Sequence, residues 1–126
     1  MDTKHTHVTI AAILGLIAVA LGAFGAHGLK ELLAERDTSA TWETAVRYQM
    51  WHALAILLCS HIGNRFNATK AATCFSSGTV LFSGSLYMLA LGGPKWLGPV
   101  TPLGGLLLII GWGLLAASSL KLPKAP

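Results

Sequence analysis

Long runs of apolar residues alternate with short polar segments along this chain. Four runs are free or almost free of charge, and they cover residues 8–26, 45–63, 71–93 and 103–120. Each run holds about the 20 residues that a helix needs to cross a hydrocarbon layer of roughly 30 Å, where a helix satisfies its own backbone. The pattern therefore predicts an all-α protein, with four transmembrane helices in a single domain over residues 1–126.

The polar segments between these runs are short. Residues 28–44 hold every carboxylate except that of Asp2, and their leucines among charged residues predict a short interfacial helix between the first and second spans. Residues 64–70 predict a tight polar turn. Residues 92–102 are rich in glycine and proline, and we expect Trp96 in this loop to lie at headgroup level.

The composition also indicates a membrane protein. Of 126 residues, 53% are hydrophobic and only 11% are charged, whereas soluble domains carry about 25% charged residues. Two cysteines are too few for a secreted scaffold held together by disulfides. These values exclude a soluble globule and a disordered chain.

Basic residues in the loops predict that both termini lie in the cytoplasm. An even number of spans places both termini on one side, and the short cytoplasmic loops of membrane proteins carry more Lys and Arg. The side of the termini holds Lys4, Arg65, Lys70, Lys121 and Lys124, and the other side holds Lys30, Arg36, Arg47 and Lys95. The first run also resembles a cleavable secretory signal, which we rank second because the other three spans need a packing partner.

Small residues recur at helical spacing in the first and fourth runs. Gly15 and Gly22 fall on one face of the first helix, and Gly104, Gly111 and Ser118 recur every seven residues in the fourth. Helices in lipid associate where small residues let their backbones approach. We therefore expect Gly15, Gly22, Gly104 and Gly111 at helix contacts, either within the chain or between protomers.

Polar residues form a stripe on each of the two middle helices. Gln49 and His52 share one arc of the second helix, and Ser76, Ser83 and Tyr87 align on the third. Uncovered polar groups cost free energy in hydrocarbon. We therefore expect both stripes to face the interior, where Ser or Tyr hydroxyls meet Gln49 and His52.

Several sequence blocks carry a family resemblance. They are GAFGAHGL at 22–29, residues 42–52, FSGSLY at 82–87, TPLGG at 101–105, and the pair Gly111 and Trp112. In this order and spacing they resemble the membrane family catalogued as domain of unknown function 423, which includes the eukaryotic transmembrane protein 256 group. The resemblance covers nearly the whole chain and implies a four-helix protein of a bacterial inner (plasma) membrane. It brings no assigned reaction and no catalytic residues.

Two histidines are the candidates for a haem or metal site. His27 ends the first run and His52 lies about two turns into the second, so antiparallel helices would place both in one leaflet. A metal site, however, needs three or four ligands, and no carboxylate or cysteine lies nearby in the spans. We therefore expect structural histidines with hydrogen-bond partners, and neither a metal nor another cofactor.

Charged and aromatic residues near the membrane surface are candidate interfacial contacts. They are His27, Lys30, Glu43, Arg47 and Trp96. Glu43 and Arg47, four residues apart, predict an ion pair on one helix face. In the structural interpretation Glu43 neutralises Arg47 where the chain enters the membrane, and in the functional interpretation the pair contacts a headgroup or a substrate beside Lys30.

The leading functional hypothesis is a non-enzymatic protein that packs against itself, membrane lipids or a larger membrane complex. Nucleotide-binding and zinc-hydrolase motifs are absent. No Asp or Glu follows Glu43, so a proton-driven antiporter would lack an acid in these spans. The alternative is a small-solute or lipid transporter whose cavity is lined by the two polar stripes. The net charge of +4 fits adhesion to anionic lipid better than binding to nucleic acid.

Overall fold

The computed structural model describes residues 2–121, and in this range it contains helices and loops but no strand. The all-α prediction is confirmed. Lys124, which the charge count placed in the cytoplasm, lies outside the described residues. The long helices are α1 (Thr3–Ala26), α3 (Ser39–Ile62), α4 (Ala68–Ala90) and α5 (Val100–Lys121), and the shorter elements are α2 (Lys30–Glu35), η1 (Arg65–Asn67) and η2 (Lys95–Leu97).

All four long helices begin before the apolar runs that they contain, because polar residues can occupy the end turns of a helix. The Asp2 carboxylate caps α1 by accepting a hydrogen bond from the His5 amide at 2.8 Å. Helix α3 begins at Ser39, six residues before the predicted span at 45. Helix α4 ends at Ala90, so residues 91–93 of the predicted third span lie in a loop.

All four long helices have the length needed to cross a membrane. They contain 22 to 24 residues and therefore measure about 33 to 36 Å, against roughly 30 Å of hydrocarbon. Within residues 2–121, two segments are also apolar enough by composition, Thr3–Ala26 and Lys95–Lys121. Helices α3 and α4 carry the polar stripes, which lower their mean hydropathy.

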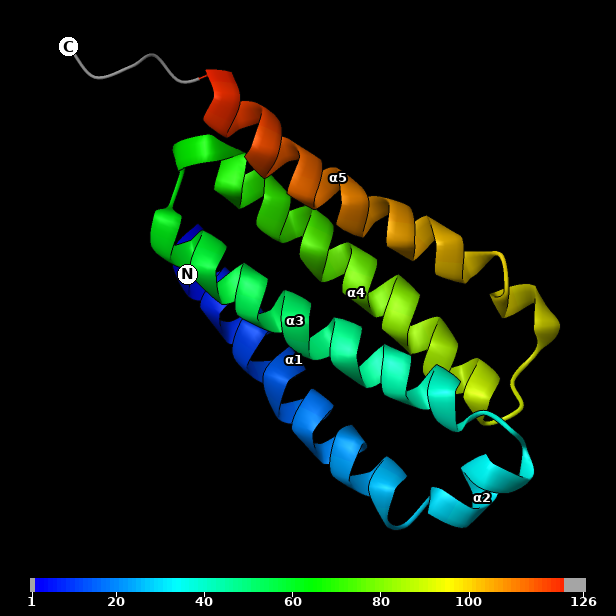
Figure 1. The fold of residues 1–126 in the computed structure, drawn as a ribbon. Helices are drawn as coiled ribbons and strands as arrows, with labels where there is room; N and C mark the ends of the chain where they lie inside the picture. The colour runs from blue at the N-terminus through cyan, green and yellow to red at the C-terminus, as the bar shows by residue number, and fades with distance from the viewer. Residues whose placement is uncertain (1, 122–126) are drawn as a thin grey trace.

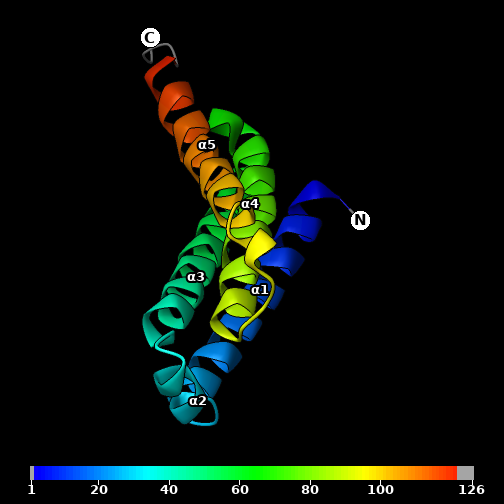
Figure 2. The same cartoon turned by 90° about the vertical axis from the view of Figure 1, so that its right-hand side faces the viewer.

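The long helices form a row in the order α1, α3, α4, α5, each antiparallel to the next (Figure 1). Helix α1 packs on α3, α3 on α4, and α4 on α5, while α1 and α5 lie at opposite edges of the row, as the turned view also shows (Figure 2). The short helix α2 closes the end where α1 stops and α3 begins (Figure 1). Each long helix therefore contacts mainly its neighbours in sequence.

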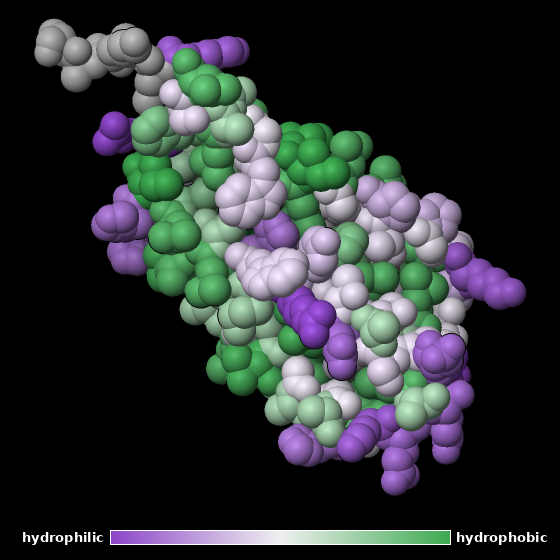
Figure 3. All heavy atoms as spheres, viewed as in Figure 1, coloured by the Kyte–Doolittle hydropathy of each residue, from purple (hydrophilic) through white to green (hydrophobic). Residues whose placement is uncertain are grey.

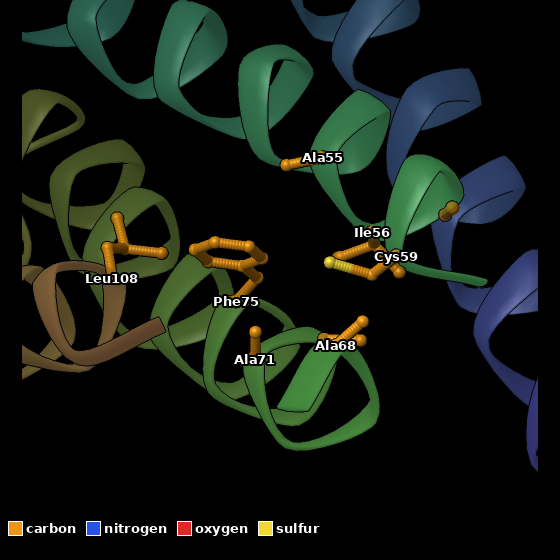
Figure 4. Packing of buried hydrophobic residues seen from close by; sticks show 9 residues of the cluster. Ala55, Ile56, Cys59, Ala68, Ala71, Phe75 and Leu108 are labelled. Atoms are coloured by element: carbon orange, nitrogen blue, oxygen red, sulfur yellow. The ribbon is translucent and has the colours of Figure 1, made fainter. Parts of the chain in front are cut away.

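Small side chains dominate the core, so the helices approach closely. In the larger of two buried clusters, the largest side chain is that of Phe75 of α4, which is fully buried and lies between residues of α3 and Leu108 of α5 (Figure 4). The other buried members of this cluster are Ala11, Ala55, Ile56, Cys59, Ala68, Ala71 and Ala72. A second cluster of Leu33, Trp42 and Ala90 lies under α2.

The surface exposes many more large apolar side chains than the surface of a soluble protein does. Large apolar side chains point outward on every long helix, among them Leu16, Leu58, Val80 and Ile109, each at least 63% exposed. Hydrophilic residues gather mainly at the two ends of the molecule, with a narrower polar band between them on the face shown in Figure 3. Apolar surface of this extent is typical of contact with lipid or protein.

Candidate functional site

The interior of the row contains a hydrogen-bonded chain centred on Gln49, which is 3% exposed. The Tyr87 hydroxyl of α4 donates to Gln49 Oε1 at 2.6 Å, and Gln49 Nε2 donates to the Leu14 carbonyl of α1 at 2.8 Å. One side chain on α3 thus connects three helices. Gln49 and Tyr87, predicted to face the interior, lie in direct contact.

A second connection between α1 and α3 comes from Trp42, which was not among the predicted site residues. Its indole N–H donates to the Leu21 carbonyl at 2.9 Å, and its ring packs edge-on against Tyr87 at a centroid distance of 4.8 Å. Trp42 and Gln49 are seven residues apart on α3, as are Leu21 and Leu14 on α1. This shared spacing fixes the antiparallel register of the two helices. The seven residues between Trp42 and Gln49 place both side chains on one face of α3, and this spacing could have identified Trp42 as an interior residue from the sequence.

His52 has hydrogen-bond partners at both ring nitrogens. Its Nδ1 lies 2.7 Å from the Tyr48 carbonyl, and its Nε2 lies 3.0 Å from the Trp112 indole nitrogen. A carbonyl only accepts and an indole N–H only donates, so Nδ1 carries the proton and Nε2 accepts. The arrangement requires a neutral imidazole and leaves no nitrogen lone pair free for a metal. The partner is an indole rather than the predicted hydroxyl.

The structure does not bring His27 and His52 together. His27 is exposed at the C-terminal end of α1. In the register set by Leu14 and Gln49, His52 lies opposite residue 11, so 16 residues of helix, about 24 Å, separate its level from that of His27. The two histidines therefore do not share the level along the row that their predicted positions implied, because α3 begins six residues earlier than expected. Within residues 2–121, no three His, Cys, Asp or Glu side chains are grouped as a metal site requires.

The two candidate serines donate hydrogen bonds to different helices. Ser83 is buried and donates to the Ala45 carbonyl of α3 at 2.7 Å. Ser76 donates to the Ala72 carbonyl of its own helix at 2.7 Å and reaches no other helix. Ser83 therefore joins the interhelical contacts and Ser76 does not.

Three of the four predicted packing glycines lie at contacts within the chain. A Cβ at Gly104 would collide with the Phe82 backbone and would lie 2.9 Å from the Gly78 carbonyl. A Cβ at Gly111 would lie 2.5 Å from the Phe75 ring, and one at Gly22 would lie 3.2 Å from Val46 Cγ1. At Gly15 a Cβ would meet nothing within 4 Å, so the packing prediction fails there within the chain.

The predicted interfacial residues lie at the end of the row that carries α2 and η2 (Figure 1). Glu43 and Arg47 form the expected ion pair, with 3.8 Å between Oε2 and the guanidinium and with both side chains more than 60% exposed. His27 and Lys30 are also exposed, and Trp96 in η2 is 67% exposed. These residues face the surroundings rather than the core.

A connection that sequence reasoning missed fastens the α2 segment to the end of α4. Arg36 Nε donates to the Ala90 carbonyl at 3.1 Å, and the Thr38 hydroxyl donates to the same oxygen at 2.8 Å. Ala90 is the last residue of α4, so a cation and a hydroxyl supply a helix C-terminus with the donors that it lacks. The sequence gives little signal for this contact, because the donors lie more than 50 residues from the acceptor.

Comparison with known proteins agrees with the resemblance found in the sequence. The family profile described as "Protein of unknown function (DUF423)" matches residues 21–105. A UPF0382 membrane protein of Staphylococcus epidermidis is 43% identical over 116 residues, covering 90% of this chain and 94% of the relative. A UPF0382 membrane protein of Haemophilus influenzae is 40% identical over 121 residues, covering 94% and 96%.

The similarity extends to a eukaryote. UPF0382 membrane protein C1782.12c of Schizosaccharomyces pombe is 38% identical over 109 residues, covering 82% of this chain and 92% of the relative. No solved structure matches the chain. With the family profile over residues 21–105 and relatives near 40% identity along most of their length, the chain belongs to the DUF423 family of membrane proteins.

Proposed function

We propose that this protein spans a bacterial inner membrane four times, with both termini in the cytoplasm, and acts by contact with lipids or membrane proteins rather than by catalysis. One observation carries the proposal. Gln49, His52 and Ser83 in the interior direct their polar atoms to partners within the chain, while the outward faces of the long helices are apolar. The outward faces are therefore available for contact with lipids or proteins, whereas few interior polar groups are left without a partner to act on a substrate.

The position of α3 and α4 supports four spans. They lie between α1 and α5, which are the two helices apolar enough to cross by composition alone. Their outward side chains include Trp51, Leu54, Leu58, Val80 and Met88, each at least 50% exposed. Their interior polar side chains form hydrogen bonds to other helices, which lower the cost of placing them in hydrocarbon; these side chains are Gln49, His52, Ser83 and Tyr87.

The glycine contacts bear on how the protein would assemble. Gly22, Gly104 and Gly111 are used between helices of the same chain. A partner protein would therefore bind to other surfaces, and the outer faces of α1 and α5 at the edges of the row are the candidates. We propose these edges as the contact surfaces for lipids or for a membrane complex.

Topology can be tested by labelling single cysteines in intact cells with a membrane-impermeant thiol reagent. The background carries Cys59→Ala and Cys74→Ala, and the reporters are Lys30→Cys and Lys95→Cys against Lys4→Cys and Arg65→Cys. Four spans predict that positions 30 and 95 label from outside, while 4 and 65 label only after the membrane is opened. Labelling of positions 30 and 65 from the same side would refute the proposal.

A reporter inside the row separates this proposal from the transporter alternative. Ser83→Cys replaces a buried hydroxyl that bonds to Ala45 of α3. If the interior is dry, the thiol at position 83 stays unreactive toward the same reagent even in opened membranes, whereas Arg65→Cys reacts. Rapid labelling at position 83 would favour a water-filled pathway and would count against a role limited to contacts.

A further inference from the structure

Helices α1 and α3 leave a groove on the side that faces away from α4. Near α2 it forms a hollow of about 570 Å³, with Gly22 and Gly25 on one wall and Lys30, Glu43 and Arg47 around its mouth. Trp42 and Val46 of α3 also line this hollow, and they lie close beside Gly25 and Gly22.

A second hollow of about 720 Å³ lies between the same helices nearer their middle. Its wall contains Gly15 and Leu16 of α1 and Met50, Leu54 and Leu57 of α3. On α3, Met50, Leu54 and Leu57 follow Arg47 by three, seven and ten residues, the spacing of one helix face. The two hollows therefore lie along one face of the helix pair, which we call the α1/α3 groove.

The length of the groove matches one leaflet of a bilayer. From Arg47 to Leu57 the chain advances ten residues, or about 15 Å, which is half of a hydrocarbon layer of roughly 30 Å. The apolar part of the groove is thus about as long as the acyl chains of one leaflet, and its charged mouth lies at the level of the lipid headgroups.

The mouth favours an anion. It contains two cations, Lys30 and Arg47, and one carboxylate, Glu43. Among the described residues Lys30 has no ion-pair partner, and the Glu43 to Arg47 distance is a long 3.8 Å with both groups exposed. An exposed ion pair of this kind contributes little free energy, so a phosphate can replace Glu43 as the partner of Arg47. A guanidinium binds a phosphate through two parallel hydrogen bonds.

The geometry points to the α1/α3 groove as a binding site for an anionic phospholipid. The phosphate lies between Lys30 and Arg47, and one acyl chain follows the apolar wall past Gly15. This inference rests on the proposed function, since α1 and α3 must cross the bilayer for a lipid to reach the groove. It also accounts for Gly15, which has small-residue spacing but no contact within the chain.

The test is native mass spectrometry of the full chain with phosphatidylglycerol and, separately, phosphatidylcholine. The variant Lys30→Gln with Arg47→Gln lowers the affinity for phosphatidylglycerol by about thirtyfold, because each cation near an anionic lipid contributes about fivefold. Binding of phosphatidylcholine, whose choline cation offsets the charge of the same phosphate, falls by a clearly smaller factor. The matched control, Arg65→Gln with Lys95→Gln, removes two exposed cations elsewhere and leaves both affinities unchanged, and Lys30→Arg with Arg47→Lys retains phosphatidylglycerol binding.

The apolar wall is tested separately by Gly15→Leu, which fills the groove and lowers binding of both lipids. Its control is Gly113→Leu, at a glycine on α5 where a Cβ also meets nothing within 4 Å. Equal lipid binding by Gly15→Leu and Gly113→Leu, or by the two double variants with glutamine, would overturn the site. A dimer that Gly15→Leu abolishes without changing lipid binding would instead assign the groove to a second copy of the chain and overturn the lipid proposal.

The two proposals fail separately. If cysteine labelling reports four spans and the lipid affinities do not respond to the variants, only the lipid site is wrong. If positions 30 and 65 label from the same side, the proposed function fails first, and the lipid site fails with it.

Discussion

Gln49 illustrates how single polar residues organise this protein. Its amide accepts a hydrogen bond from Tyr87 and donates one to the Leu14 carbonyl, so one side chain links α3 to two other helices in an apolar interior. Ser83 and Trp42 use the same device, each donating to a backbone carbonyl of a neighbouring helix. In lipid such bonds hold helices together where the hydrophobic effect does not.

The hydrogen bond from Tyr87 to Gln49 can be tested with Tyr87→Phe. The variant leaves Gln49 Oε1 without its donor, and we expect the free energy of unfolding in micelles to fall by about 0.6 to 1.7 kcal/mol. The control is Ser76→Ala, which removes a hydroxyl that reaches only its own helix and should change stability by less than about 0.5 kcal/mol. An equal loss of unfolding free energy in the two variants would show that the hydrogen bond between Tyr87 and Gln49 does not stabilise the protein.

The tautomer of His52 can be read directly. Nitrogen NMR of the imidazole should show a protonated Nδ1 and an accepting Nε2, because Trp112 donates to the latter. In Trp112→Phe the Nε2 resonance should shift as its donor disappears, whereas Trp96→Phe, which alters an exposed indole in η2, should leave it unchanged. A protonated Nε2 in the unaltered protein would contradict the assigned pattern.

At the scale of elements, glycine sets the distance between α4 and α5. Gly78 and Gly104 face each other across this contact, and Phe75 occupies the space that Gly111 leaves. The seven-residue spacing of Gly104 and Gly111 was visible in the sequence. Their partners were not, because Gly78 belongs to no comparable stripe on the third span.

Gly104→Ala should therefore destabilise the protein by about 1 to 3 kcal/mol, since the added Cβ meets rigid backbone and forces the helices apart. Gly113→Ala, on the same helix, places its Cβ in open space and should change stability by no more than about 0.5 kcal/mol. Thermal unfolding in one detergent compares the two. Indistinguishable midpoints would mean that α4 and α5 do not approach as closely as described.

At the scale of the whole molecule, the helices form an open row rather than a closed ring. A ring would place α1 beside α5, but each long helix packs mainly on its sequence neighbours (Figures 1 and 2). The row leaves more apolar surface toward lipid than a ring of the same helices would, and it leaves the α1/α3 groove uncovered.

Cysteine cross-linking distinguishes the two arrangements. The pair Asn67→Cys with Ser118→Cys replaces side chains that lie 2.7 Å apart between η1 and α5, and it should oxidise rapidly to an intramolecular disulfide. The pair Thr3→Cys with Leu120→Cys joins exposed ends of α1 and α5 and should oxidise much more slowly. Mobility on a non-reducing gel measures both, and similar rates for the two pairs would indicate a closed ring.

The sequence by itself determined the helical class, the positions of the long helices to within six residues, and the family. These follow from the apolar runs and the sequence blocks, which are local features. Four features were decided only by the tertiary structure: the register of α1 on α3, the Trp112 to His52 bond, the contact of Arg36 with Ala90, and the open space beside Gly15. Each depends on which face of a helix meets its neighbour, and periodicity along one helix does not fix its rotation against another.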